Sequence, residues 1–204
     1  MTLYALARGL LLALFRTVWR MRVAGTEHVP RSGPLILACN HVSYLDPPVL
    51  GCAAPRPVTF MAKIELFRIP VLGPLIAAVG AFPVDRGKGD VVAIRTAVKE
   101  LERGGCIGIF PEGGRVRPGE ERAAQPGVAL LAYLSRARVV PAAIVGSNQA
   151  IRLTKISVRF GEPMELRPAA KKATREELEA FASAVLANIR ALHGQEREHR
   201  DRRA

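Results

Sequence analysis

Short apolar runs alternate with amphipathic segments along the chain. Runs without a polar period are typical of strands buried on both faces of a parallel sheet. We expect such strands at 35–39, 58–61, 80–84, 106–110, 139–145 and 156–160. Apolar residues at helical spacing predict helices from residue 46, at 90–103, at 128–135 and at 174–192. This alternation predicts an α/β domain with a mixed, largely parallel sheet flanked by helices.

The signals at the helix ends agree with this pattern. Asp46 precedes Pro47 and Pro48, which predicts a helix that Asp46 caps and that carries the prolines in its first turn. Thr174 and Glu177 have the spacing of a capping box at the start of the last helix.

The N-terminal segment combines apolar and basic residues. Its uncharged stretches are too short for the roughly 20 residues that span a bilayer, and no cleavage site of a signal peptide follows. We therefore expect residues 1–24 to form an amphipathic helix on a membrane surface, with its arginines at the lipid headgroups. The alternative is a terminal helix packed on the core with solvated arginines. The segment contains no acidic residue and four arginines, Arg8, Arg16, Arg20 and Arg22.

The length of 204 residues suits one domain, which we expect at 25–192. Residues 195–204, QEREHRDRRA, are almost wholly charged and lack apolar periodicity, so we expect 193–204 to form a charged, frayed tail. An apolar content of 49% argues against disorder. The three cysteines exclude a disulfide framework and have no zinc-ligand spacing.

The charge balance indicates a polyanionic partner. The chain has 30 Lys and Arg against 18 Asp and Glu, a net charge of +12. A nucleic acid, a membrane surface and a phosphorylated substrate all fit this charge. The low aromatic content of 5% and the lack of a groove-reading motif argue against a nucleic acid.

The segment 40–46, NHVSYLD, is the most informative for chemistry. His41 follows a buried strand and Asp46 begins a helix, so the carboxylate can reach the Nδ1–H of the imidazole and leave Nε2 as a general base. The alternative is a core histidine beside a capping aspartate. A serine nucleophile is not indicated, because no G-x-S-x-G elbow is present. Cys39 lies within the apolar run, where a thiol is usually inert.

Two further loops follow predicted strands. The segment 110–115, FPEGGR, contains two glycines whose amides can approach an anion, and Arg115 can bind a phosphate through two nitrogens. The segment 80–86, GAFPVDR, ends in an acid–arginine pair. The alternative for each is an ordinary surface turn. Around Gly87 the spacing of a nucleotide-binding P-loop is absent.

Taken in order, the blocks NHVSYLD, GAFPVDR, FPEGGR and VVPAAIVG resemble those of the glycerophospholipid acyltransferases, most of all the bacterial 1-acyl-glycerol-3-phosphate acyltransferases. The resemblance extends over about residues 20–165. One departure is Gly114, which stands where the family commonly has threonine. The resemblance implies a catalytic pair, His41 and Asp46, and substrate-binding residues Lys63, Arg86, Glu112, Gly113 and Arg115.

The resemblance also implies an activity. The chain would move a fatty acyl group from acyl-CoA or acyl-carrier protein to the sn-2 hydroxyl of 1-acyl-glycerol-3-phosphate and so form phosphatidic acid. His41 would act as general base without a covalent intermediate, and no metal or redox cofactor would be needed. The enzyme would be a peripheral protein on the cytoplasmic face of the cell membrane, in contact with an anionic surface and with a lysophospholipid acceptor.

Several alternatives remain open from the sequence. The acceptor could be glycerol-3-phosphate, another lysophospholipid or a lyso-aminolipid. The more distant readings are a non-catalytic lipid-binding protein and a basic nucleic-acid-binding module. An apolar segment provides either core residues or a groove for the acyl chain, with Val71, Leu72, Leu75, Ile76 and Val79 as candidates.

Overall fold

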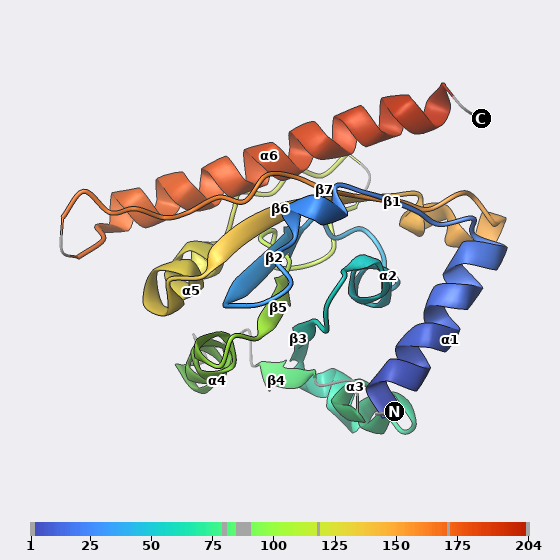
Figure 1. Ribbon diagram of the computed structural model, residues 1–204, viewed down its shortest axis with the longest axis horizontal. Helices are drawn as coiled ribbons and strands as arrows, with labels where there is room; N and C mark the ends of the chain where they lie inside the picture. The colour runs from blue at the N-terminus through green and yellow to red at the C-terminus, as the bar shows by residue number, and fades with distance from the viewer. Residues whose placement is uncertain (1–2, 79–80, 85–90, 118, 171, 203–204) are drawn as a thin grey trace.

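The computed structural model describes residues 3–78, 81–84, 91–117, 119–170 and 172–202. In these residues a seven-stranded sheet lies between two layers of helices (Figure 1). The strands are β1 (Arg22–Ala24), β2 (Leu35–Cys39), β3 (Thr59–Lys63), β4 (Phe82–Val84), β5 (Cys106–Ile109), β6 (Arg138–Val145) and β7 (Ser157–Phe160). The α-helices are α1 (Leu3–Val18), α2 (Asp46–Ala53), α3 (Leu72–Ala78), α4 (Val91–Glu102), α5 (Gly127–Ser135) and α6 (Arg175–Asp201). The 3-10 helices are η1 (Thr26–His28), η2 (Ile64–Arg68) and η3 (Ser147–Arg152).

The sheet has the strand order β1-β7-β6-β2-β5-β3-β4. The strands β6, β2, β5, β3 and β4 are mutually parallel. β7 runs antiparallel to β6, and β1 is parallel to β7. The prediction of an α/β domain with a mixed, largely parallel sheet is confirmed.

Strand β2 divides the core into two clusters because its side chains alternate between the faces of the sheet. Leu35, Leu37 and Cys39 pack in the cluster that contains the buried residues of α1 and α2. Ile36 and Ala38 pack in the cluster that contains those of α4, α5 and α6. Every residue of β2 is buried, which explains the continuous apolar run.

Helix α2 begins differently from the prediction. Leu45 is the N-cap, and it forms no side-chain cap. Asp46 is the first helical residue, and its carboxylate accepts hydrogen bonds from the amides of Val42 and Ser43 in the preceding loop. The predicted role of Asp46 as N-cap is therefore wrong, whereas prolines in the first turn are confirmed.

Helix α1 ends at Val18 rather than at residue 24, because the chain turns at Arg20 (φ 45°) and enters β1. Phe15 is buried in the core. Arg8 donates hydrogen bonds to the carbonyl oxygens of the last turn of α2, at 3.2 Å to Gly51, 3.1 Å to Cys52 and 2.5 Å to Ala54. The expectation that Arg8 meets lipid headgroups is therefore wrong, because its guanidinium binds these carbonyl groups.

Helix α6 opens with the predicted capping box of Thr174 and Glu177. It continues to Asp201, so the predicted end near residue 192 and the frayed tail after it are wrong. Beyond residue 192 the helix is tied to the sheet by Glu196, which is buried and accepts a hydrogen bond from Arg159 of β7 at 2.7 Å. No described helix is both long enough and apolar enough to cross a membrane.

Candidate active site

The parallel strands bring three of the predicted site segments to one edge of the sheet. His41 follows β2, and Glu112 and Arg115 follow β5. Lys63 is the last residue of β3, so all four lie at or just beyond the carboxyl ends of parallel strands. Open α/β sheets bind ligands at this edge. Arg86 lies outside the described residues.

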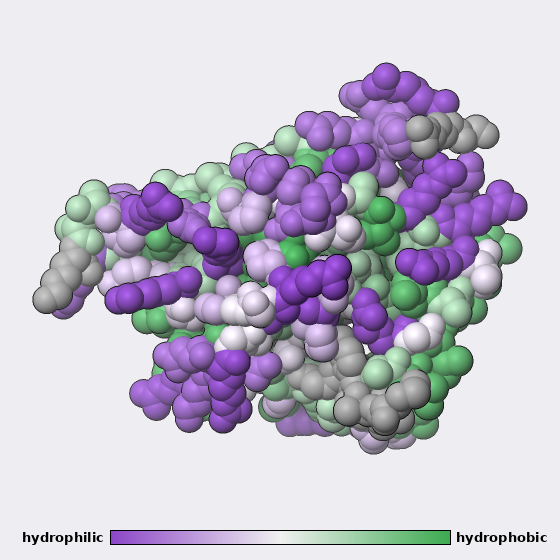
Figure 2. Space-filling view, viewed as in Figure 1, coloured by the Kyte–Doolittle hydropathy of each residue, from purple (hydrophilic) through white to green (hydrophobic). Residues whose placement is uncertain are grey.

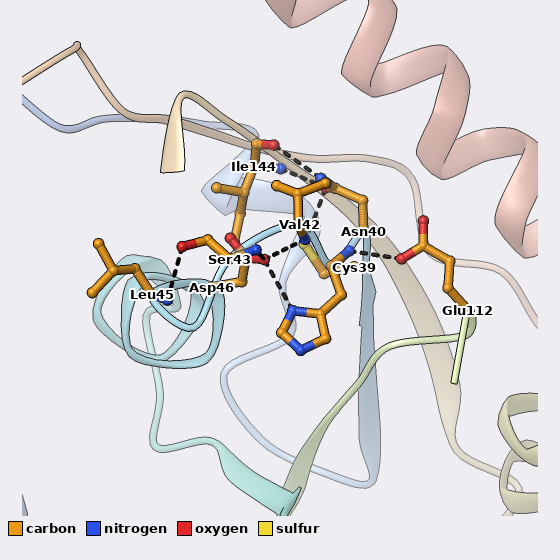
Figure 3. Close-up of polar contacts among 9 residues, drawn as sticks. Cys39, Asn40, Val42, Ser43, Leu45, Asp46, Glu112 and Ile144 are labelled. Atoms are coloured by element: carbon orange, nitrogen blue, oxygen red, sulfur yellow. Dashed lines mark hydrogen bonds and ion pairs between the residues drawn. The ribbon is translucent and has the colours of Figure 1, made fainter. Parts of the chain in front are cut away.

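His41 and Asp46 form a hydrogen-bonded pair (Figure 3). His41 Nδ1 lies 3.0 Å from Asp46 Oδ2. The same oxygen accepts the amides of Val42 and Ser43 at 2.7 Å each. The side chain of Asp46 is completely buried. The three donors replace the water that Oδ2 would otherwise bind, whereas Oδ1 has no hydrogen-bond partner among the described residues.

The pairing defines the chemistry of the imidazole. An oxygen that already accepts two amide hydrogens acts as an acceptor toward the ring, so Nδ1 carries the hydrogen. Nε2 then presents a lone pair, and no described residue forms a hydrogen bond with it. This geometry is one in which Nε2 can accept a proton while the carboxylate holds the tautomer.

The loop after β5 holds His41 from the other side. The backbone N–H of His41 donates to Glu112 Oε2 at 2.7 Å, and the backbone carbonyl of His41 accepts the Val116 amide at 2.7 Å. The imidazole stacks on the ring of Phe110 with centroids 4.1 Å apart. Backbone and ring are both fixed by contacts with the segment 110–116.

Glu112 is expected from the sequence to bind the acceptor, and its observed contact is with His41. The pKa of Glu112 is raised to about 6, mainly by burial and in smaller part by the nearby Asp46. The hydrogen bond from His41 and the charges of Arg190 and Arg122 act in the opposite direction. Glu112 therefore changes its charge near pH 6 while it contacts the backbone of the candidate base.

Asn40 joins the end of β2 to β6. Its amide nitrogen donates to the Ile144 carbonyl at 3.0 Å, and its amide oxygen accepts the Ile144 N–H at 2.8 Å. Asn40 is buried, so both of these bonds are shielded from water. They set the position from which the chain enters the loop between β2 and α2, residues 40–45, which we call the His41 loop.

Arg115 is held by Tyr44 of the His41 loop. Its guanidinium lies 3.6 Å from the centroid of the Tyr44 ring, and Nη2 donates to the Tyr44 hydroxyl at 2.8 Å. An open depression of about 820 Å³ begins here and is lined by three arginines and by Glu120, which pairs with Arg122. Its lining consists of Val42, Arg115, Val116, Arg117, Gly119, Glu120 and Arg122.

The other predicted binding residues that the structure describes are Lys63 and Gly113. Lys63 is exposed and pairs with Glu65 at 3.1 Å. Gly113 has φ 71°, which favours glycine, and its N–H donates to the Phe110 carbonyl. For Lys63 and Gly113 the role in acceptor binding stays a prediction.

The apolar segment that was a candidate groove or core lies around α3. Val71 is 81% exposed, which contradicts a core position for this residue. Leu72 and Ile76 are half-buried and belong to neither core cluster. Val79 lies outside the described residues, and the side chain of Leu75 is not described.

Cys39 is inert, as its position in the apolar run indicates. Burial raises the pKa of the Cys39 thiol well above its ordinary value. The thiolate needed for nucleophilic attack is therefore disfavoured.

Three residues of the site carry no assigned role in the sequence prediction: Asn40, Tyr44 and Phe110. Each belongs to a motif block that was recognised, 40–46 or 110–115. Their contacts join residues that are distant along the chain, so spacing alone contains no signal for them.

Comparisons with known proteins agree with this geometry. The family model described as Acyltransferase matches residues 20–145, and the chain belongs to this family. The 1-acyl-sn-glycerol-3-phosphate acyltransferase of Bacillus subtilis (strain 168) is 31% identical over 176 residues, which cover 84% of this chain and 87% of that protein. A protein of the same name from Streptococcus pneumoniae is 26% identical over 98% of this chain and 77% of its own length.

Two further matches are a relative that is similar over a shorter region and a solved structure. The lyso-ornithine lipid O-acyltransferase of Pseudomonas aeruginosa is 40% identical over 96 residues, 47% of this chain and 35% of that protein. The crystal structure of the 1-acyl-sn-glycerophosphate (LPA) acyltransferase PlsC from Thermotoga maritima has a TM-score of 0.68 at 24% identity, over 94% of this chain and 82% of that chain. This structure shows the same fold. The chain is therefore an O-acyltransferase of the glycerophospholipid type.

Proposed function

We propose that this enzyme transfers a fatty acyl group to the sn-2 hydroxyl of 1-acyl-glycerol-3-phosphate and forms phosphatidic acid. The observation that carries the proposal is the pair of His41 and Asp46 at the carboxyl edge of the sheet, with Nδ1 bonded and Nε2 available. The names of the relatives that match along most of their length support the acceptor class.

In this mechanism Nε2 of His41 removes the proton from the acceptor hydroxyl. The acceptor oxygen forms a bond to the thioester carbonyl carbon of the donor, and the carbon–sulfur bond breaks. The imidazolium of His41 then donates the proton to the leaving thiolate. Asp46 stabilises the imidazolium through Nδ1. The acyl group passes directly from sulfur to oxygen, without a covalent enzyme intermediate and without a metal or redox cofactor.

The acceptor phosphate would bind to cations beside the His41 loop. Arg115 is the leading candidate, because Tyr44 holds its guanidinium at the rim of the basic depression. Arg86 and Lys63 follow from the family resemblance. We assign Glu112 to positioning His41, since its carboxylate contacts that backbone.

The donor would be acyl-CoA or acyl-carrier protein, and the reaction would take place at the cytoplasmic face of an anionic membrane. The membrane location is supported by α1, because apolar residues are exposed on its outer side. A helix whose outer side faces water normally has polar residues there. The exposed residues are Leu6, Leu10, Leu11, Leu14 and Val18.

The first test replaces the candidate base. His41→Ala should lower kcat by about 10²–10⁴, the usual contribution of a general base, in an assay of thiol release from acyl-CoA. The exposed His199→Ala serves as matched control and should keep full activity. Near wild-type turnover by a folded His41→Ala protein would contradict the mechanism.

A second acceptor class deserves a direct comparison, because the lyso-ornithine lipid O-acyltransferase is the relative with 40% identity. Its shared region spans 96 residues. A panel of 1-acyl-glycerol-3-phosphate, glycerol-3-phosphate, another lysophospholipid and a lyso-aminolipid separates the candidates. The proposal expects the highest kcat/KM for 1-acyl-glycerol-3-phosphate, and a higher value for the lyso-aminolipid would reassign the acceptor.

A further inference from the structure

The 3-10 helix η3 lies beside the C-terminal end of α1 (Figure 1). The indole N–H of Trp19 donates to the Ala150 carbonyl at 2.8 Å, and the Ile156 amide donates to the Trp19 carbonyl at 3.0 Å. These bonds tie η3 and the residues after it to the end of α1. We call the surface formed by the outer side of α1 and by Ile151 to Leu153 the α1–η3 face.

Large apolar side chains are exposed on both parts of this face. Ile151 is 100% exposed and Leu153 is 63% exposed. On α1 the exposed apolar residues recur at every fourth position, so they form one stripe along the helix. Figure 2 shows apolar residues along the edge that α1 forms. The stripe consists of Leu6, Leu10, Leu14 and Val18, which are between 38% and 66% exposed.

The backbone of Leu153 adds a second observation. Leu153 has φ 52° and ψ 32°, a left-handed conformation that glycine or asparagine adopts at lower cost. A leucine there destabilises the loop and also exposes an apolar side chain to water. Neither effect benefits an isolated protein, so the residue points to a contact outside the chain.

The charges of the α1–η3 face indicate which contact. No acidic residue occurs in residues 1–26 or 147–161. The exposed basic residues Arg16, Arg20 and Arg152 accompany the apolar ones. Apolar residues bordered by cations match the boundary between the acyl chains and the headgroups of an anionic bilayer.

We propose that η3 is a second membrane-contact element, which inserts Ile151 and Leu153 into an anionic bilayer beside α1. The inference rests on the proposed function, in which the enzyme works at a membrane surface. One helix on a bilayer leaves the protein able to rotate about the helix axis. A second contact beyond the end of α1 removes this rotation and holds the carboxyl edge of the sheet at one height above the lipid.

The test uses the full chain and extruded vesicles of equimolar phosphatidylglycerol and phosphatidylcholine. The variant Ile151→Ser/Leu153→Gly removes both apolar groups and relieves the left-handed conformation at 153. Its partition coefficient, measured by co-sedimentation, should fall about tenfold or more because two apolar side chains no longer enter the lipid. Its Tm should equal or exceed that of the wild type.

A matched control removes two other exposed apolar residues. Val91 and Val92 are 58% and 72% exposed on α4, which lies away from α1 in Figure 1. Val91→Ser/Val92→Ser should bind vesicles within twofold of the wild type. Equal vesicle binding by the two double variants would overturn the proposal. So would a wild-type protein that is dimeric in solution, if the η3 variant is monomeric and the α4 variant stays dimeric.

A second readout separates this inference from the proposed function. The η3 variant should acylate a short-chain acceptor, present as monomers in solution, at the wild-type rate, and should lose activity only toward acceptor in vesicles. Lack of acyl transfer by the wild type would defeat the proposed function. Unchanged vesicle binding by the η3 variant, with an active wild type, would defeat the membrane role of η3 alone.

Discussion

The His41 loop and the α1–η3 face depart from the usual distribution of side chains in opposite ways. In the loop, a carboxylate is completely buried and accepts three hydrogen bonds at one oxygen. On the face, Ile151 is completely exposed and leucines line the outer side of α1. A buried charge and an exposed apolar stripe each destabilise an isolated protein. The buried carboxylate suits an imidazole that must keep one tautomer. The exposed apolar stripe suits a surface that contacts lipid.

Helix α2 connects the two regions. Its first residue is Asp46, and the carbonyl groups of its last turn accept hydrogen bonds from Arg8 of α1. The same short helix therefore positions the partner of His41 and receives α1. The comparison teaches that the position of α1 and the position of the Asp46 carboxylate both depend on the short helix α2.

The largest effect should come from the charge at the buried end of α2. Asp46→Asn retains an oxygen for the amides of Val42 and Ser43 but removes the charge that stabilises the imidazolium. We expect kcat to fall by about 10²–10⁴ with a small change in Tm. Asp46→Ala also removes the acceptor of the loop amides, so its Tm should fall by several degrees more, measured by thermal unfolding. Equal Tm values for the two variants would contradict the structural role of the carboxylate in the loop.

At the other end of α2, Arg8 and Arg16 should differ. Arg8→Met leaves the carbonyl groups of the last α2 turn without their donor, at a cost of about 1.5–3 kcal/mol, which corresponds to a loss of about 3–10 °C in Tm. Arg16 is exposed, so Arg16→Ala should keep its Tm and bind anionic vesicles about fivefold more weakly, from about 1 kcal/mol per cation at the surface. If Arg16→Ala lowered the Tm as much as Arg8→Met, the division between structural and lipid-facing arginines would be wrong.

The smallest effect is a pH dependence at Glu112. Burial raises the pKa of this carboxyl from 4.5 in the unfolded chain to about 6, so the folded protein holds the proton more tightly. The stabilisation from this group is complete below pH 4.5 and is lost as the pH rises through about 6. Glu112→Gln keeps an oxygen for the His41 amide and does not ionise. Its Tm relative to the wild type should therefore rise between pH 4.5 and 6.5, and a difference independent of pH would contradict the raised pKa.

Secondary structure and contacts between residues close together in the sequence were predictable. The run 35–39 predicted a buried strand, and the spacing at 90–103 predicted α4, because burial and helix periodicity leave marks in the residue types. The motif 40–46 also predicted that Asp46 reaches His41, because five residues across a strand–helix junction bring the two together.

Contacts between distant segments were not predictable in the same way. Arg8 was assigned to lipid, since its side chain gives no indication that the end of α2 lies within reach. The frayed tail was expected because residues 193–204 lack an apolar stripe, yet the hydrogen bond from Arg159 of β7 to the buried Glu196 ties that part of α6 to the sheet. Glu112 was assigned to the acceptor, and only the neighbouring strands β2 and β5 bring it to the His41 amide.

The sequence by itself determined the class of fold, the order of most elements, the acyltransferase motifs and the surplus of positive charge. These follow from residue types and short spacings, which act within a few residues of the chain. The tertiary structure alone decided which arginine binds protein, which carboxylate holds the backbone of His41, and which apolar residues remain exposed. Those outcomes depend on the parallel order of the strands, because it brings together segments that are 40 to 130 residues apart in the chain.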